Sequence, residues 1–401
     1  MLWLMLWACT GAPEPGATPT QSATPSPPSI PSAVAPTQSR RVQDPVKPDA
    51  SLQDANTHLE QVVEAHTRDP SNPWAIGHGL VAEGQNMPLS NGQPAVEWLF
   101  SSYAERIKVG QSWALVFPEA RGSTRIEPHP DLLLKALTDA GIPPNHPVTV
   151  MGHSHTVSDL YTGVLAETFY DPKTKQGNFK SENDIPWTLF GVASWSKPDL
   201  VWTNAAGHTT SFDALTDYAA EHLTTVTQFI AESQSNGKPF QKRGQGIFAF
   251  SCGGAHMIQG VIHARIRGFG SASDDGPFEE QLNRLVYRYP IELKQIDAGR
   301  VSHPEFKVPL LVQRLKLTGH TLETMARIAA SGAPKAPTGT ELTAYARDLA
   351  ESVQLLEKSE VFKNLNTLRT KNEQLYLDVV GDSAHALRGL RIATGQATVV
   401  Y

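Results

Sequence analysis

Residues 213–230 read DALTDYAAEHLTTVTQFI, and apolar residues recur in this stretch every three or four positions. This spacing puts them on one face of an α-helix, so the stretch predicts an amphipathic helix. Residues 51–66, SLQDANTHLEQVVEAH, show the same pattern. Strand-like alternation is rare, and the best short candidates are PVTVM at 147–151 and ATVVY at 397–401. We therefore predict that residues 51–401 form a single all-α domain.

A dipeptide of a small residue and His recurs along this domain. It occurs as Gly77-His78, Gly152-His153, Gly207-His208, Ala255-His256, Gly319-His320 and Ala384-His385. Each copy lies at or near the start of a predicted helix, and the intervals of 48 to 75 residues suit a helical hairpin plus loops. Six hairpins closed into a ring predict an (α/α)6 toroid. An open α-hairpin solenoid is the alternative. The repeated histidines either line a shared cavity or fill equivalent packing niches.

The segment GIFAFSCGGAHMIQGVIHARI, residues 246–266, carries the most informative polar side chains. If it is helical, Cys252, His256, Gln259 and His263 form a stripe about 60° wide. An unpaired buried polar group costs about 1–3 kcal/mol, so such a stripe favours a cavity beside it. A thiolate and an imidazole one turn apart could bind zinc or act as nucleophile and base. The alternative is a buried thiol beside hydrogen-bonded histidines.

In this local chemistry the segment resembles zinc-containing toroid enzymes such as protein prenyltransferases and lanthionine cyclases. Those enzymes use a Cys and a His at the mouth of the ring. The resemblance implies a zinc ion held by Cys252 and His256. The second thiolate or carboxylate of those enzymes has no match in this sequence.

A second group is Gly319-His320-Thr321-Leu322-Glu323, in which His320 and Glu323 share a helix face. It is similar to the Gly-His-x-x-Glu signature of the sugar 2-epimerases, which are (α/α)6 barrels. That resemblance implies that His320 is a general acid/base working beside Glu323. The alternative is that Thr321 caps a helix and His320 lies just outside it.

His153 and His208 complete the set of candidate catalytic histidines. Each is followed within a few residues by Thr and Asp, a pattern that equally suits an ordinary helix start. If one cavity exists, Cys252, His256 and His320 should lie near one another. Several tryptophans could stack on a ring-shaped substrate, or simply pack in the core. They are Trp74, Trp98, Trp187, Trp195 and Trp202.

Composition excludes several classes of protein. The 401 residues carry a net charge of −6, which argues against a nucleic-acid partner. Apolar residues make up 40%, which excludes wholesale disorder, and two cysteines cannot build a disulfide framework. The sequence has no phosphate loop, GxGxxG, GxSxG or HExxH, so nucleotide-dependent and serine-hydrolase functions have no motif support.

The first nine residues, MLWLMLWAC, place Cys9 directly after an apolar run that is too short to span a membrane. They resemble a bacterial lipoprotein signal with the box Leu6-Trp7-Ala8-Cys9. The resemblance implies cleavage of residues 1–8 and attachment of lipid, including palmitate, to Cys9. No Lys or Arg precedes the run, a departure that a start codon farther upstream would explain. In the lipoproteins that this signal resembles, a residue other than Asp after the Cys, here Thr10, implies the outer membrane if the host has two membranes.

Residues 11–48 hold 10 of the 30 prolines, so we predict that residues 9–50 are the lipidated Cys and an extended tether. The sequence thus predicts a membrane-anchored, extracytoplasmic lipoprotein, at the outer membrane or periplasmic face if there are two membranes. Its activity would be that of an enzyme on a carbohydrate or cell-envelope substrate in a histidine-lined cavity. The alternatives are a non-catalytic ligand- or protein-binding lipoprotein, and a zinc-binding protein using Cys252 and His256.

Overall fold

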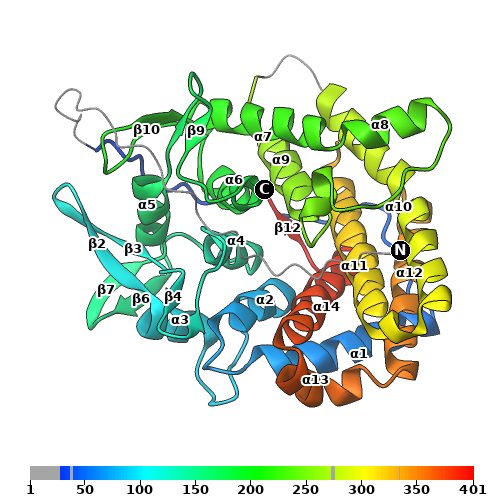
Figure 1. Cartoon of the computed structure of the whole chain (residues 1–401). Helices are drawn as coiled ribbons and strands as arrows, with labels where there is room; N and C mark the ends of the chain where they lie inside the picture. Colours follow the sequence, from blue (N-terminus) through cyan, green and yellow to red (C-terminus); the bar gives the residue numbers. More distant parts are fainter. Residues whose placement is uncertain (1–27, 37–38, 272–275, 334) are drawn as a thin grey trace.

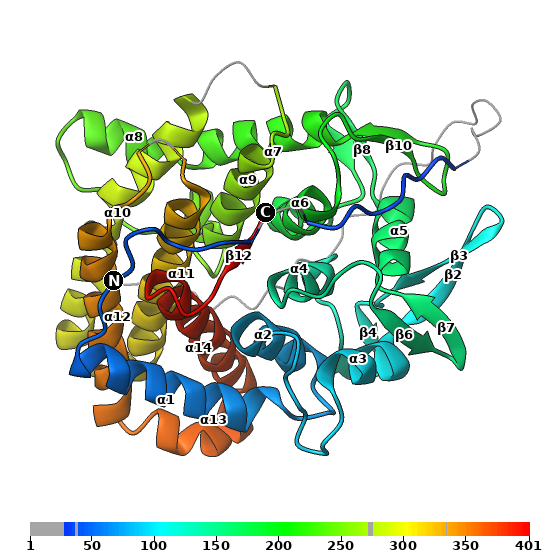
Figure 2. The same ribbon diagram turned by 180° about the vertical axis from the view of Figure 1, so that it is seen from behind.

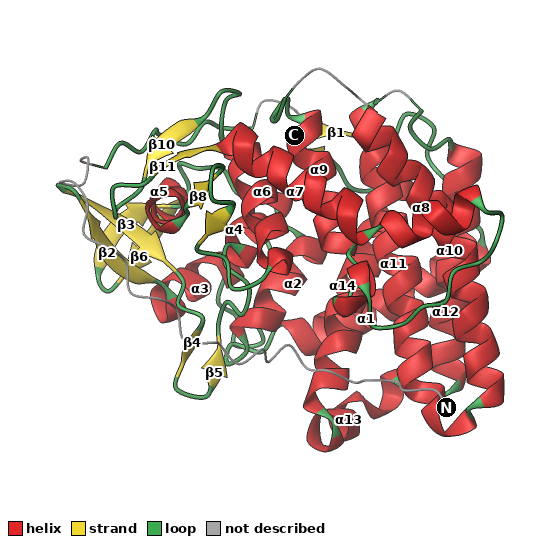
Figure 3. Cartoon of the chain, turned by 45° about the horizontal axis from the view of Figure 1, so that its top comes forward, coloured by secondary structure: helices red, strands yellow, loops and turns green. Residues whose placement is uncertain are grey.

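A computed structural model describes residues 28–36, 39–271, 276–333 and 335–401. This part of the chain contains fourteen α-helices and four short 3-10 helices, while its strands form six two-stranded antiparallel sheets. Figure 3 shows that helices make up most of the molecule. The predicted predominance of helix is confirmed.

Six helices pack against one another in chain order (Figure 1). Helix α2 contacts α4, α4 contacts α6, α6 contacts α9, α9 contacts α11, α11 contacts α14, and α14 contacts α2. Their bounds are α2 Pro73–Glu83, α4 Leu132–Asp139, α6 Ile185–Trp195, α9 Ala255–Ile266, α11 Lys307–Ser331 and α14 Glu373–Ala393.

The other helices alternate with these six along the chain and pack against one or more of them. They are α1 Ala50–Thr67, α3 Ala95–Tyr103, α5 Ser158–Glu167, α7 Phe212–Val226, α8 Gln228–Ser235, α10 Gly276–Ser302, α12 Gly339–Lys358 and α13 Leu365–Lys371. Helix α8 contacts α10 and α7 instead, and it continues from α7 after a break at Thr227. The 3-10 helices are Glu182–Asp184, Gly246–Ala249, Pro304–Phe306 and Phe362–Asn364.

Helix α1 illustrates how sequence pattern becomes helix. Asp49 accepts a hydrogen bond from the backbone N–H of Leu52 and thereby caps the helix. Leu52, Leu59 and Val63 lie on one face and are buried. The helix predicted over residues 51–66 is therefore confirmed, whereas the single helix predicted over 213–230 is divided into α7 and α8.

The strands are short and mostly form hairpins. The pairs are β2 Glu105–Val109 with β3 Ser112–Val116, β4 Ala120–Arg121 with β5 Thr124–Arg125, β6 Pro147–Val150 with β7 His153–Thr156, β8 Tyr170–Asp171 with β9 Gln176–Gly177, and β10 Val201–Thr203 with β11 Thr209–Ser211. The last pair, β1 Ser39–Arg40 with β12 Val399–Val400, joins the two ends of the described chain. Both predicted strand segments contain strands, β6 and β12.

The described part of the predicted tether lies against the folded body. The backbone N–H of Val34 donates to Trp195 O at 2.8 Å, and that of Val46 donates to Ala393 O at 2.9 Å. Val42 and Val46 are buried. Figure 2 shows this segment crossing one face of the molecule beside the C-terminus. Cys9 and residues 1–8 lie outside the described residues, so the proposed anchor and the domain division stay predictions.

Helices α11 and α14 approach each other closely through glycines. A Cβ added to Gly319 would lie 2.9 Å from Ala386 Cβ, and one added to Gly389 would lie 2.7 Å from the backbone N of Glu323. Only glycine allows this spacing. The close contact fixes the register between the two helices, and with it the relative positions of His320 and His385. No helix in the described ranges is long and apolar enough to cross a membrane.

Candidate metal centre

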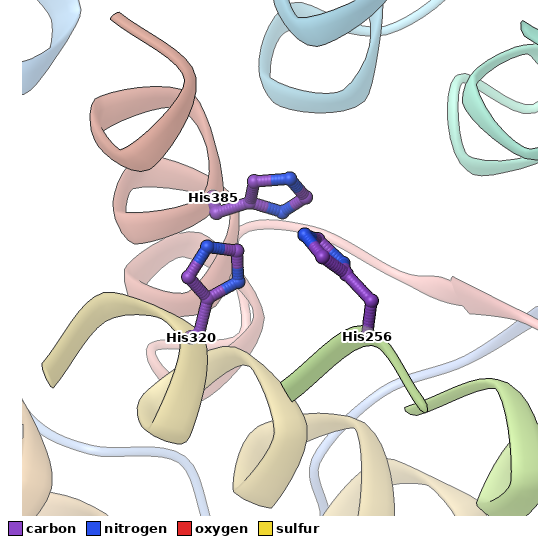
Figure 4. A group of neighbouring side chains, drawn as sticks. All are labelled: His256, His320 and His385. Atoms are coloured by element: carbon purple, nitrogen blue, oxygen red, sulfur yellow. The ribbon is translucent and has the colours of Figure 1, made fainter. Parts of the chain in front are cut away.

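Three histidines from three helices converge inside the molecule (Figure 4). His256 lies in the first turn of α9, while His320 and His385 lie in the middle of α11 and α14. One nitrogen from each ring lies within 4.8 Å of the other two. The ring centroids are 4.7 Å apart for His256 and His320, 5.1 Å for His256 and His385, and 4.4 Å for His320 and His385.

Each of the two buried rings, those of His320 and His385, contacts a carboxylate through one nitrogen. His385 Nδ1 lies 2.8 Å from Glu323 Oε2, and His320 Nε2 lies 3.3 Å from Asp382 Oδ1. The opposite nitrogens, His385 Nε2 and His320 Nδ1, are buried and have no hydrogen-bond partner among the described residues. A neutral imidazole that donates one N–H to a carboxylate presents a lone pair at its other nitrogen. This is how metal-binding histidines are commonly oriented.

The environment of His256 and His385 keeps their imidazoles neutral. Burial is the main cause that holds the pKa of His256 well below its ordinary value, and the neighbouring His320 and His385 add to the effect. Burial likewise lowers the pKa of His385 to about 3, although Glu323 opposes the shift. Because the neutral form is the one that binds a metal, both rings are in the required state at physiological pH.

A chain of charged side chains leads away from His385. Arg327 Nη2 bridges two carboxylates, since it lies 2.8 Å from Glu323 Oε1 and 2.8 Å from Asp139 Oδ2. Asp139 Oδ2 is also 2.8 Å from Lys135 Nζ. All four groups are buried. Burial alone would raise the pKa of Glu323, but Arg327 and His385 lower it well below its usual range. The same balance, with Arg327 and Lys135 as the cations, lowers the pKa of Asp139 to about 2.

Aromatic rings flank the three histidines on two sides. Trp187 of α6 lies against His256 with a centroid distance of 4.3 Å, and His129 stacks on the same tryptophan at 5.6 Å. On the other side, the ring of His78 lies 5.5 Å from that of His385, and Trp74 packs on His78 at 4.0 Å. The cluster therefore draws side chains from all of α2, α6, α9, α11 and α14.

The donor set fits a zinc ion. Catalytic zinc sites use three protein ligands with Zn–N distances of about 2.0–2.1 Å, which puts ligand nitrogens about 3.4 Å apart. The three nitrogens lie within 4.8 Å of one another, so the rings would have to draw together to bind the ion. The carboxylates behind His320 and His385 would supply the second layer of hydrogen bonds that such sites use.

Two predicted site residues, His320 and Glu323, lie on one face of α11 but serve different partners. His320 contacts Asp382, whereas Glu323 holds His385 and Arg327. Both residues are in the interior of the helix, which runs from Lys307 to Ser331. The alternative that Thr321 caps a helix start is therefore wrong, because thirteen residues of helix precede His320.

Cys252 does not share a helix face with His256. Helix α9 begins only at Ala255, because Gly253 and Gly254 have φ of 59° and 74°, outside the helical region. The helix predicted from residue 246 onward is wrong for this reason. Cys252 is half-buried, lies in the preceding turn, and is not part of the histidine group. It is close enough to Lys316 to influence the pKa of that lysine.

The rest of the predicted polar stripe on α9 faces the buried network. Gln259 Nε2 donates to Thr324 Oγ1 at 3.0 Å and to Glu323 Oε2 at 3.2 Å. His263 Nε2 lies 2.8 Å from Ser194 Oγ, and its ring stacks on Phe190 at 3.9 Å. Polar groups on this otherwise apolar helix thus have partners across α6 and α11.

His153 and His208 lie away from the cluster. His153 is exposed in strand β7, and His208 is exposed in the turn between β10 and β11, where its ring rests on Phe169 at 4.2 Å. Of the six repeated histidines, His78, His256, His320 and His385 converge. The expected position at or near a helix start is wrong for His320 and His385, which are in mid-helix. His153 and His208 lie in hairpins that shortly precede α5 and α7.

Sequence reasoning named His256 and His320 but assigned no chemistry to His385 or His78. The repeated small-residue–His dipeptide was the signal that could have found them. No pattern in the sequence pointed to Lys135, Asp139 or Arg327. Of the predicted stacking tryptophans, Trp74 and Trp187 border the cluster, Trp195 and Trp202 are in the core, and Trp98 donates to Pro70 O.

No protein-family model matches this sequence, and neither curated proteins nor solved structures give a match. The function must therefore be inferred from the site itself.

Proposed function

We propose that this chain is a membrane-anchored, extracytoplasmic lipoprotein whose folded body is an enzyme with a single zinc ion. His256, His320 and His385 would bind the ion. The observation that carries the proposal is that one nitrogen from each of the three rings lies within 4.8 Å of the other two, while His385 Nε2 and His320 Nδ1 are buried and have no partner among the described residues. Leaving two buried nitrogens without a partner costs about 1–3 kcal/mol each, and a bound metal would remove that cost.

The arrangement of ligands supports a catalytic rather than a structural site. Three histidines leave a fourth zinc position open, and a zinc-bound water has its pKa lowered to about 7. The corresponding reaction class is metal-assisted hydrolysis or hydration. Of the three ligands His256 is the half-buried one, so we propose that a substrate would approach from its side. A carbohydrate or cell-envelope substrate remains our expectation, with Trp74 and Trp187 as flanking surfaces.

We also propose that the six helices packed in chain order are the inner ring of an (α/α)6 toroid. The contact of α14 with α2 supports closure, since an open solenoid would leave its first and last hairpins apart. The alternation of these helices with outer ones supports the same arrangement. In such a ring the histidines would lie near the axis, where the inner helices meet.

The anchor is proposed from sequence. The apolar run from Leu2 to Ala8 and the following Cys9 support a lipid attachment, and the prolines after Cys9 support a spacer. A lipid anchor would keep the metal centre outside the cytoplasm. Cys252 would then be a single free thiol in that compartment. It is not part of the ligand group.

The test is the zinc content of protein purified without added metal or chelator. We expect about one equivalent in the wild type and in Cys252→Ala, and little in His320→Ala or His256→Ala. Circular dichroism would establish that the variants are folded, and His256 offers the milder change because it is half-buried. The proposal would be refuted if the wild type held no zinc after zinc addition and dialysis. It would also be refuted if Cys252→Ala lost zinc while His320→Ala retained it.

A further inference from the structure

Lys135 of α4 is a buried cation with unused hydrogen-bonding capacity. Its side chain is 3% exposed, and its only ion-pair partner among the described residues is Asp139, at 2.8 Å. The ammonium has three N–H donors, and none of them makes a well-oriented hydrogen bond to a described residue. Removing such a group from water is costly unless something compensates it.

Asp139 does not need Lys135 for its neutralisation. The same oxygen, Oδ2, already accepts a hydrogen bond from Arg327 Nη2 at 2.8 Å. Arg388 adds a third buried cation, which donates to the backbone O of Asp139 at 3.2 Å. Three buried cations therefore surround two buried carboxylates, Asp139 and Glu323, and the network has a surplus positive charge before any metal is counted.

Lys135 and the histidine cluster have one neighbour in common, Trp187. Lys135 Nζ is 5.9 Å from the ring centroid of Trp187 and 5.3 Å from that of Phe190. The same Trp187 packs on His256. Burial is the largest cause of the lowered pKa of His256 and His385, and the charge of Lys135 adds to it at both rings. Trp187 Nε1 is a second buried donor without a hydrogen-bond partner in the described ranges.

We infer that the substrate of this site carries an anionic oxygen group, a carboxylate or a phosphate, which binds between the metal and the ammonium of Lys135. The inference rests on the proposed zinc site, because the metal supplies the other half of the anion-binding pair. A zinc ion adds two positive charges to a network that already has an excess, so an anion would be bound more strongly than a neutral group of the same shape. Lys135 acts as the point charge and donor for one oxygen.

The experiment uses the full chain loaded with cobalt(II) in place of zinc, because the visible spectrum of cobalt reports both metal binding and ligand exchange. The cobalt protein would be titrated with acetate, with inorganic phosphate and with acetamide, the neutral analogue of acetate. We expect saturable spectral changes with at least one anion, and affinity about tenfold or more above that for acetamide. The tighter of the two anions identifies the group as carboxylate or phosphate.

Variants then assign the effect to Lys135. Lys135→Gln should weaken anion binding about tenfold or more, whereas Lys135→Arg should retain most of it. The matched control is Lys242→Gln, which removes a lysine that pairs with Glu292 instead. If Lys135→Gln does not fold, the comparison of acetate and phosphate with acetamide on the wild type still tests whether the site prefers anions.

The outcomes separate the two proposals. If cobalt binds but no anion is preferred over acetamide, or if Lys135→Gln binds anions as the wild type does, the anionic substrate class is wrong and the metal site stands. If cobalt does not bind at all, the metal site itself is wrong.

Discussion

At the scale of single residues, the decisive feature is the difference between the two nitrogens of each buried ring. His320 and His385 each have a carboxylate on one side and no described hydrogen-bond partner on the other. A histidine that only fills a packing niche would be expected to use both nitrogens or to lie among apolar groups, as burying an unpaired polar atom is unfavourable. The arrangement is therefore better explained as two oriented ligands.

Asp382 offers a test at this scale. It contacts His320 Nε2 at 3.3 Å and Lys316 at 3.7 Å, whereas Asp378 contacts Lys316 at 3.3 Å and no described histidine. We expect Asp382→Ala to reduce zinc affinity about 10–100-fold, because the ring of His320 loses its orienting partner. Competition with a chelator measures the affinity. Asp378→Ala is the control, and an equal loss in both variants would show that Lys316, not His320, is responsible.

Part of the site could be predicted residue by residue. His256 and His320 stood out because each belongs to a local pattern, and Gln259 and His263 followed from the helical period. His385 and Lys135 did not, because their roles depend on contacts between residues more than 50 positions apart. Cys252 was overvalued because sequence spacing alone does not show where Gly253 and Gly254 interrupt the helix.

At the scale of elements, the packing of α11 on α14 sets the geometry of the centre. Both helices carry a ligand near their midpoints, and glycines at the contact bring the backbones together. The sequence pattern predicts Gly319-His320 at or near a helix start, and glycine is uncommon within helices. Gly319 is instead inside the helix, where the absence of a side chain lets Ala386 approach. Close packing explains a residue that local propensity disfavours.

Gly389→Ala tests this contact. The new Cβ would meet the backbone of Glu323 at 2.7–2.9 Å, and backbone cannot rotate away. We expect the free energy of unfolding to fall by about 1–3 kcal/mol, together with weaker zinc binding because α11 and α14 must separate. The matched control is Gly299→Ala in α10, whose Cβ would make ordinary contacts of 3.5–3.8 Å with Leu310. This control should be neutral or stabilising by about 0.5–1 kcal/mol. Denaturant titration compares the two, and equal effects would contradict the account.

At the scale of the whole molecule, the helical class followed from periodicity, because amphipathic helices need one buried face each. Periodicity did not predict the order in which the helices pack. Nor did it predict the course of residues 28–36 and 39–49, which lie along the body, because two buried valines and a few backbone hydrogen bonds leave no periodic signal. Burial of several histidines is likewise a property of the assembled molecule, and it makes stability depend on pH.

The sign of this dependence follows from the direction of the shifts. Burial lowers the pKa of His78 to about 4 and, with Arg327, that of His263 to about 3, from an ordinary value of 6.5. Below pH 6.5 the unfolded chain therefore binds more protons than the folded one, and stability is lost as the pH falls toward 4. Buried carboxyl groups oppose this, because burial raises the pKa of Asp131 to about 7 and that of Glu127 well above its usual value, so the contribution of one histidine is measured by mutation.

His263→Gln isolates one such contribution in metal-free protein. Between pH 6 and pH 4.5 we expect the free energy of unfolding of the wild type to fall by about 1.4 kcal/mol per pH unit more than that of the variant. The reason is that unfolding of the variant takes up one proton fewer. His208→Gln, at an exposed position, should keep the wild-type slope. The slopes come from urea titrations at several pH values. Identical slopes for all three proteins would mean that His263 titrates normally in the folded state.

The central claim, a zinc ion held by three histidines, is tested most directly by X-ray absorption at the zinc edge of the zinc-loaded protein. We predict a first shell of nitrogen and oxygen at about 2.0 Å with the outer scattering of three imidazoles, and no sulfur at about 2.3 Å. The spectrum of Cys252→Ala should be unchanged, and that of His385→Ala should lose one imidazole or the metal altogether. A sulfur ligand in the wild type, or fewer than three imidazoles, would contradict the account.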